Sequence, residues 1–247
     1  MSYIKADGIV IKEINTGEAD KILTILSKNK GKITVFAKNS RRPRSKLVAG
    51  TQNMCYSNFM LFKGRDMYTM NSCDVIEPFY DLRCDIVKLT YVAHILELVN
   101  DIIQEEQPAS KTLQLLLNTL YIIAKTDRSC ELLTRIFELR FLAILGYAPY
   151  VNGCINCGSD DSEHMNFSFK KCGFLCNSCS LIDINAIPLS KGAVKSIYYI
   201  IHCSIKELFS FDVSEGVLQE LGLITKRFIK DRFEKEYKKL DYLKSLM

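Results

Sequence analysis

Two pairs of cysteines carry the clearest chemistry in this sequence. Cys154 and Cys157 form one CxxC motif, and Cys176 and Cys179 form a second one after 18 intervening residues. A CxxC turn directs two thiolates at one ion, and Gly158, after the first pair, leaves backbone amides open to donate to the sulfurs. Two such turns supply four sulfur ligands in a tetrahedron, which is how Zn²⁺ is bound in structural sites. The spacing therefore predicts one structural zinc ion with no coordination position left for water.

Other uses of these cysteines stay open at the level of sequence. Two buried or redox-active dithiols need the same motifs, although a thioredoxin-type site also needs a βαβ context that is missing here. An iron–sulfur cluster also takes four thiolates. His164 and Cys172 are alternative ligands, but neither belongs to a CxxC pair. The six cysteines outside the motifs are scattered along the chain, which is typical of a protein from a reducing cytosol.

A second candidate site is a run of basic residues from Lys28 to Lys46. These 19 residues hold eight lysines and arginines and no acidic residue. Arginine in a loop holds phosphates bidentately, and each neutralised phosphate releases counterions. The segment therefore predicts a binding site for a polyanion. Its expected contacts are Lys32, Lys38, Arg41, Arg42, Arg44 and Lys46.

The basic run also has plainer interpretations. A charged loop often serves only to keep a protein soluble, and a phospholipid surface or a nuclear-localisation signal uses similar charge. No amphipathic anchor accompanies this loop, however. Aromatic residues on neighbouring strands (Tyr56, Phe59 and Tyr68) either stack on unpaired bases or fill the interior of a barrel. For Phe59 the interior is the favoured position.

The distribution of charge supports a polyanionic partner for the N-terminal third. The chain has a net charge of +5, but its first 80 residues hold 13 basic and 7 acidic side chains, a net of +6. No run of 18 apolar residues exists, so the sequence predicts no membrane-spanning helix. The first residues lack the pattern of a secretory signal, and a cytoplasmic protein is expected.

The first 80 residues predict a small β-barrel. Apolar and β-branched runs indicate five short strands, and turn residues at 29–31 and 63–66 favour hairpins. The expected strands cover residues 8–14, 21–26, 32–37, 54–62 and 67–70. Five strands in this length fit an OB-fold, with an SH3-like barrel as the competing interpretation.

The remaining residues, 81–247, predict a helical domain. Helical spacing of apolar residues covers 83–104, 108–124, 131–146, 190–203 and 214–246, whereas 150–182 is an insert with little periodicity. We therefore expect an α+β protein with an OB-fold nucleic-acid-binding domain at 1–80 and a helical domain at 81–247, which carries the zinc-binding insert at 150–182.

The sequence offers no arrangement for catalysis. Its three histidines, His94, His164 and His202, are isolated from one another and from any nucleophile. Motifs for a serine hydrolase, a zinc protease or a phosphate-binding glycine loop are missing. The sequence predicts a protein that is not an enzyme.

The order of these features resembles the RecO family of bacterial recombination mediators over nearly the whole chain. Residues 17–26 look like the family's stretch before its second strand, and 31–32 with 37–45 resemble its basic loop. Residues 137–140 with 146–149 are similar to the helix that leads into the family's cysteine insert, and the two CxxC pairs follow.

The chain departs from the family pattern in two places. Asn39 stands where a glycine is common, and Cys172-Gly173 stands where paired glycines are common.

The resemblance implies a fold, an activity and partners. RecO-like proteins combine an OB-fold with a helical domain, bind single- and double-stranded DNA and anneal complementary strands. With RecR they help to load RecA onto strands coated with single-stranded-DNA-binding protein (SSB). They act in the bacterial cytoplasm, in association with the nucleoid. The family's pocket for the acidic SSB tail lies on the helical domain, where Arg128, Arg135 and Arg140 are candidates by charge alone.

Two other functions share the same features. In one, the protein is an interaction scaffold that uses its zinc insert as the recognition surface. In the other, it is an RNA-binding factor that uses the barrel and the basic loop.

Overall fold

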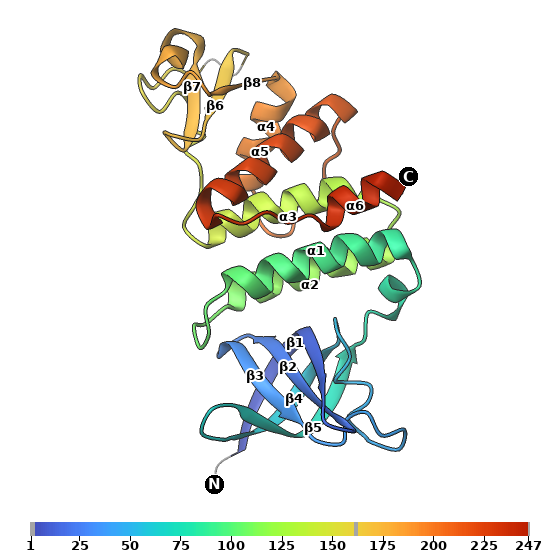
Figure 1. Ribbon diagram of the computed structural model, residues 1–247. Coiled ribbons are helices and arrows are strands. Elements are labelled where there is room, and N and C mark those ends of the chain that lie inside the picture. Colours follow the sequence, from blue (N-terminus) through green and yellow to red (C-terminus); the bar gives the residue numbers. More distant parts are fainter. Residues whose placement is uncertain (1–2, 161–162, 247) are drawn as a thin grey trace. The chain divides into compact units, whose positions relative to one another are not determined.

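The computed structural model describes residues 3–160 and 163–246, and its contacts divide the chain into two units (Figure 1). The first unit runs to Thr126 and includes the residues from Lys239 onward, whereas the second is Asp127–Lys238. Each unit has its own core. The predicted functional boundary at residue 80 stays a prediction.

The first unit begins with a closed five-stranded barrel, which is visible at the lower end of Figure 1. Its strands follow the order β1-β2-β3-β5-β4, with a parallel pairing of β3 and β5 and an antiparallel closure of β1 on β4. This topology confirms the predicted OB-fold over the SH3-like alternative. The strands are β1 (Tyr3–Thr16), β2 (Asp20–Ser27), β3 (Gly31–Ala37), β4 (Tyr56–Lys63) and β5 (Tyr68–Glu77).

One strand belongs to two sides of the barrel. β1 has 14 residues, and its register shifts between Val10 and Lys12. Its first half pairs with β4 and its second half with β2. A bulge of this kind bends a strand and allows a sheet to close on itself.

Alternate residues of the strands fill the barrel. Leu23, Ile25, Val35 and Leu61 have no exposed surface, while Phe59 is 1% exposed and Tyr68 7% exposed. The interior position predicted for Phe59 is therefore confirmed. Tyr68 lies in the same core, which removes both rings from any surface site.

Three helices complete the first unit, together with a short 3₁₀ helix, η1 (Tyr80–Arg83). They are α1 (Ile86–Ile102), α2 (Ser110–Lys125) and α6 (Lys239–Leu246). The Asp85 carboxylate accepts hydrogen bonds from two backbone amides and caps α1.

Gly31, at a φ of 64°, lies so close to the α1–α2 connection that a Cβ there would be 1.9 Å from the Gln107 carbonyl oxygen. Only glycine fits this approach.

The second unit packs α3 (Cys130–Ile144), α4 (Lys191–His202) and α5 (Glu215–Phe233) against one another. Between α3 and α4 lies the cysteine-containing insert. It folds as a three-stranded antiparallel sheet in the order β7-β6-β8, and η2 is a 3₁₀ helix beside it. These elements are β6 (Met165–Ser168), β7 (Gly173–Cys176), η2 (Asn177–Ile182) and β8 (Ile187–Leu189).

Two predicted elements differ from the structure. The insert at 150–182 has little periodicity in the sequence, yet it contains regular structure: β6 and β7 lie inside this range, and β8 continues the same sheet to Leu189. Strands of three or four residues are too short to give a periodic pattern. The helix predicted over 214–246 is interrupted: α5 ends at Phe233, followed by Glu234 with a left-handed φ of 52°. α6 is a separate helix that belongs to the other unit.

Candidate functional site

The four cysteines of the two CxxC motifs come together in the insert. Their sulfur atoms all lie within 4.8 Å of one another, and the Sγ atoms of Cys157 and Cys176 are 3.6 Å apart. Tetrahedral bonds of about 2.3 Å to one ion would place sulfurs about 3.8 Å apart, whereas a disulfide needs about 2.05 Å. All ten cysteines are free thiols. The donor set therefore fits a single metal ion.

Local backbone geometry builds the first half of this cluster. The Cys154 amide donates to the Ser159 carbonyl at 2.6 Å, and the Gly158 amide donates to the Cys154 carbonyl at 2.8 Å. Gly158 adopts a φ of 78°, a conformation that favours glycine and closes the turn. The Ile155 amide donates to the Phe174 carbonyl at 2.8 Å and joins the turn to β7.

The second half of the cluster comes from the end of β7 and from η2. Cys176 is the last residue of the strand, and Cys179 lies one helical turn later. The Asn156 amide nitrogen donates to the Cys179 sulfur at 3.3 Å. Sequence reasoning missed this contact, because an asparagine inside a CxxC motif gives no signal of its own.

Electrostatics within the cluster favour a bound cation. Burial raises the pKa of Cys154, but three backbone N–H groups outweigh it and lower the pKa to about 6. The amide of Asn156 lowers the pKa of Cys179, yet burial and the three neighbouring sulfurs raise it to about 12. One thiolate thus forms readily, whereas four adjacent thiolates repel one another unless a cation neutralises them.

The alternative ligands Cys172 and His164 do not belong to the cluster found among the described residues. Cys172 has a φ of 56°, and its carbonyl accepts a hydrogen bond from the Tyr150 amide at 2.9 Å. A Cβ at Gly173 would lie 2.6 Å from the Tyr150 carbonyl oxygen. Glycine would therefore suit both positions of this turn. At position 172 the left-handed φ strains a cysteine, and at position 173 a side chain would collide with Tyr150.

The basic segment follows β3 directly and is built from consecutive turns. The Arg42 amide donates to the Asn39 carbonyl at 3.2 Å, and the Ser45 amide donates to the Arg42 carbonyl at 2.9 Å. The Asn39 amide donates to the Asp20 carboxylate at 2.6 Å, which joins the segment to the start of β2. Asn39 has a φ of 53°, a left-handed conformation that asparagine tolerates better than most residues.

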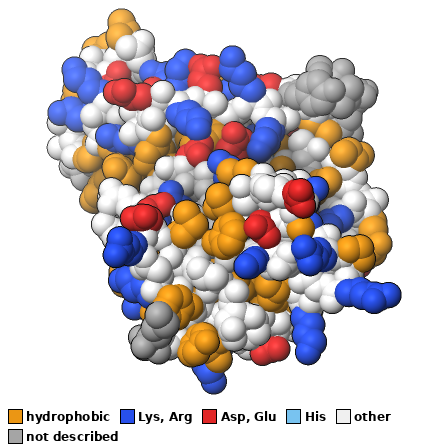
Figure 2. Space-filling model, turned by 60° about the horizontal axis from the view of Figure 1, so that its bottom comes forward, with side chains coloured by type: hydrophobic (Ala, Val, Ile, Leu, Met, Phe, Trp, Pro, Cys, Tyr) orange, Lys and Arg blue, Asp and Glu red, His pale blue; other side chains and the backbone are white. Residues whose placement is uncertain are grey.

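Five of the six predicted contact residues on this segment are exposed. Figure 2, in which the barrel end comes forward, shows lysine and arginine side chains with hydrophobic side chains between them on the barrel. The exposed five are Lys38, Arg41, Arg42, Arg44 and Lys46, named below as the basic segment.

Lys32 is placed differently from these five. Its ammonium donates to the Asn100 carbonyl at 2.7 Å, in the last turn of α1, and the residue is partly buried. A cation at this end of a helix is favourable, because the last carbonyls carry partial negative charge. Lys32 thus supports the packing of α1 on the barrel, and we leave it out of the basic segment.

The three arginines considered for an acidic tail are all engaged within the second unit. Arg128 pairs with Asp212 at 2.8 Å and also donates to the Phe211 carbonyl. Arg135 forms a buried ion pair with Glu138 at 2.8 Å. Arg140 donates to three carbonyls at the end of α4. Each guanidinium therefore has a structural role.

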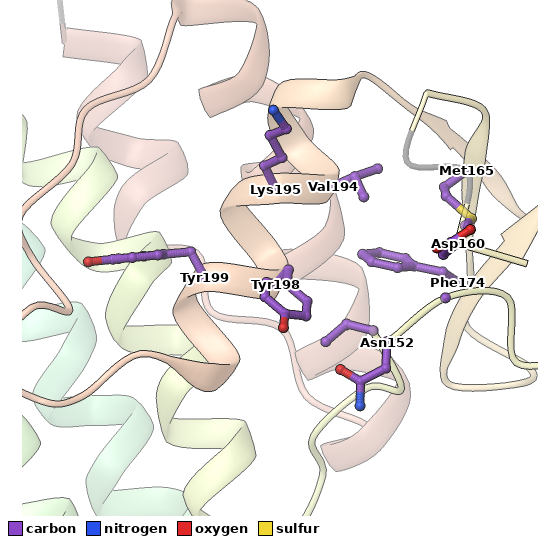
Figure 3. A pocket seen from close by; sticks show the side chains of 10 residues that line it. Asn152, Asp160, Met165, Phe174, Val194, Lys195, Tyr198 and Tyr199 are labelled. Carbon is purple, nitrogen blue, oxygen red and sulfur yellow. The ribbon is translucent and has the colours of Figure 1, made fainter. Parts of the chain in front are cut away.

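A cleft of about 500 Å³ lies between the insert and α4 (Figure 3). Its walls include Met165, Phe174, Val194 and Tyr198, and Lys195 lines it from the exposed side of α4. Apolar walls with a few polar groups are typical of a binding cleft.

No described helix is both long enough and apolar enough to cross a membrane.

Two protein-family models match this chain. The model described as Recombination protein O N terminal matches residues 1–79, and the one described as Recombination protein O C terminal matches residues 83–241.

Curated proteins that are similar to the chain carry the name DNA repair protein RecO. The one from Acetivibrio thermocellus is 59% identical over 246 residues, which cover 100% of this chain and 98% of that protein. Those from Alkaliphilus metalliredigens and Caldicellulosiruptor saccharolyticus are 36% and 35% identical, over 92% and 99% of each chain. Taken with the OB-type barrel and the four-cysteine cluster, these matches show that the chain belongs to the RecO family of DNA repair proteins.

Proposed function

We propose that this protein is a non-enzymatic recombination mediator of the bacterial cytoplasm, associated with the nucleoid. It binds single- and double-stranded DNA through residues 1–80 and anneals complementary strands. With RecR it helps to load RecA onto SSB-coated single strands. The observation that carries this proposal is the basic segment, which presents five exposed cations beside an OB-type barrel.

The geometry of the basic segment suits contact with phosphates. Backbone hydrogen bonds fix its turns to the barrel, so the side chains project from a preorganised base. Arg41, Arg42 and Arg44 are exposed, and a guanidinium binds phosphate through two parallel hydrogen bonds. These contacts read no sequence, which is what a protein that anneals arbitrary complementary strands requires.

We also propose that the cluster holds Zn²⁺. Four thiolates around one ion are the usual structural zinc site, and they leave no position for a reacting water. In an iron–sulfur cluster the ligands bind several irons, which spreads their sulfurs further apart than the 4.8 Å limit here. When bound, the ion would hold the insert together and would not take part in a reaction.

Annealing of SSB-coated complementary oligonucleotides tests the function directly. We expect the wild-type protein to accelerate duplex formation, as followed by quenching between two dye-labelled strands. The Arg41/Arg42/Arg44→Ala variant is expected to slow the reaction about tenfold, because fewer phosphates are neutralised as the strands approach.

The matched control for this assay is the Lys170/Lys171/Lys206→Ala variant, which removes three exposed charges from the second unit. It should anneal at the wild-type rate. Equal rates with and without the wild-type protein would contradict the proposed function.

A second activity is supported by the cleft beside α4. We propose that it receives the acidic SSB tail at its Lys195 end, where an exposed cation borders the apolar walls, whereas the carboxylate of Asp160 lines the same cleft beside the insert. The Lys195→Glu variant is expected to bind a fluorescent tail peptide about fivefold more weakly, since an exposed ion pair is worth up to about 1 kcal/mol. Lys206→Glu, an equal charge change elsewhere in this unit, should leave the affinity unchanged in the same anisotropy measurement. Identical losses in the two variants would assign the effect to net charge and not to the cleft.

A further inference from the structure

The outer surface of the barrel carries one continuous row of mainly apolar side chains. The row follows paired residues from strand to strand: Tyr3 pairs with Phe62, Phe62 with Thr69, and Thr69 with Phe36. Phe36 in turn pairs with Ile22, and Ile22 with Ile14. The row therefore crosses all five strands. We call it the outer row.

These side chains point away from the barrel core. Successive side chains of a strand alternate between its two faces, and the residues next to the outer row, such as Val35, Leu61 and Tyr68, fill the interior. Tyr3 is 61% exposed and Ile14 is 49% exposed. Ile22, Phe36 and Phe62 keep part of their surface accessible. The outer row is thus an apolar stripe on a solvent-facing surface.

Two of its rings form a small platform. The centroids of Tyr3 and Phe62 are 6.3 Å apart, with their planes at 67° to each other. Edge-to-face packing of this kind orients both rings while leaving ring surface open. Phe36 lies two strands away from Phe62 along the same row, with β5 between them.

Positive charge flanks the outer row. Lys5 is two residues from Tyr3 on β1, so it lies on the outer face about 7 Å along the strand. Lys38 directly follows the last residue of β3, two residues after Phe36, and is exposed. Lys38 is also the first residue of the basic segment, which makes the two surfaces continuous. Of the nearby carboxylates, Glu13 pairs with Lys21 at 2.7 Å and Asp20 accepts from the Asn39 amide, whereas Asp7 is exposed two residues after Lys5 on the same strand.

We propose that the outer row is the base-stacking surface of this protein, on which Tyr3, Phe36 and Phe62 receive unpaired bases of a single strand. Lys5 and Lys38 hold the phosphates beside those bases. This inference rests on the proposed DNA-binding function and names the chemistry by which single strands are recognised. Alternating stacking surfaces and cations match a single strand, because every unpaired base offers a flat face and every linkage a charge. A duplex keeps those faces inside its stack.

The chain contains no tryptophan, which allows one fluorescent probe to report on the outer row. We expect the single tryptophan of Phe62→Trp to be quenched by an oligothymidylate and to respond little to an abasic strand of the same length. A tryptophan on α2, introduced as Tyr121→Trp at a side chain 56% exposed, should not respond to either strand. Absence of quenching at position 62, under conditions where anisotropy shows the oligothymidylate bound, would overturn the proposal.

Affinity measurements give a second, independent test. The Tyr3→Ala/Phe62→Ala variant is expected to bind oligothymidylate at least about 30-fold more weakly than wild type, since it removes two rings and each stacked base is worth about 1–3 kcal/mol. Its affinity for the abasic strand and its salt dependence should be unchanged. Equal losses on both strands would show that the rings act only through the barrel's stability, and would overturn the proposal.

The same measurements separate this inference from the function on which it rests. If the arginine variant weakens binding while the ring variant matches wild type, DNA binding stands and the stacking surface is refuted. If wild type binds neither strand, both proposals fail.

Discussion

Cys154→Ser is expected to unfold the insert and to release its metal ion. Cys154 is 1% exposed and faces three other sulfurs, so a serine there removes a quarter of the ligands from a closed site. Structural zinc sites contribute apparent binding free energies of about 10–16 kcal/mol at pH 7, which is as large as the stability of a whole domain. Three strands of three or four residues cannot replace that contribution.

Elemental analysis and limited proteolysis measure this outcome. Wild-type protein purified without chelator should contain about one zinc ion per chain, and the variant should contain much less. New cleavage sites should appear between residues 150 and 190, while the barrel stays resistant because it lies in the other unit. DNA affinity should be nearly unchanged for the same reason.

Cys172→Ser is the matched control, because Cys172 lies in the insert but outside the cluster. This variant should retain its zinc and its protease resistance. Wild-type protein without any bound metal would refute the four-thiolate site, and loss of zinc from the Cys172 variant would mean that the ligand set is wrong.

Arg41/Arg42/Arg44→Ala is expected to flatten the salt dependence of single-stranded DNA binding. Each phosphate contact on a single strand contributes about 0.7 to the slope of log K against log salt, so losing three lowers the slope by about 2. At 50 mM salt the affinity should then fall by about 100-fold or more, and the difference should shrink as salt rises. Fluorescence anisotropy at four or five salt concentrations measures both quantities.

Two variants serve as controls for this experiment. Lys170/Lys171/Lys206→Ala removes the same charge from the second unit and should keep the wild-type slope. Lys32→Ala removes a lysine from the barrel whose ammonium binds the Asn100 carbonyl, and it should lower thermal stability without changing the slope. A wild-type slope in the arginine variant would exclude the basic segment from the DNA site.

Short-range patterns in the sequence specified the metal cluster and the barrel. The CxxC spacing encodes a local turn that presents two sulfurs, and a four-sulfur site forms when the fold brings two such turns together. Alternating apolar residues separate the two faces of each strand, which identified all five strands and placed Phe59 inside. Both patterns are local in the sequence, so the turns and strands can be predicted from them without knowledge of the tertiary contacts.

Positions that depend on distant partners were not available from the sequence. Lys32 is one of eight basic residues in a run, yet its partner Asn100 lies 68 residues away. The guanidinium groups of Arg128 and Arg140 likewise donate to partners that are 60 or more residues away in the sequence. Charge alone suggests ligand contacts for all three, because a sequence does not reveal which charges the fold itself uses.

The sequence by itself determined that this chain has a basic OB-type barrel, a helical region and four thiolates that fit one ion. Only the tertiary structure decided where β8 ends the insert, why Glu234 splits the last helix, and which aromatic rings remain outside the barrel. The outer row is the clearest case, since Tyr3, Phe36 and Phe62 come into one row only through the registers of the paired strands. Register is a property of strand pairs, and a shift by one residue would have turned these rings into the core.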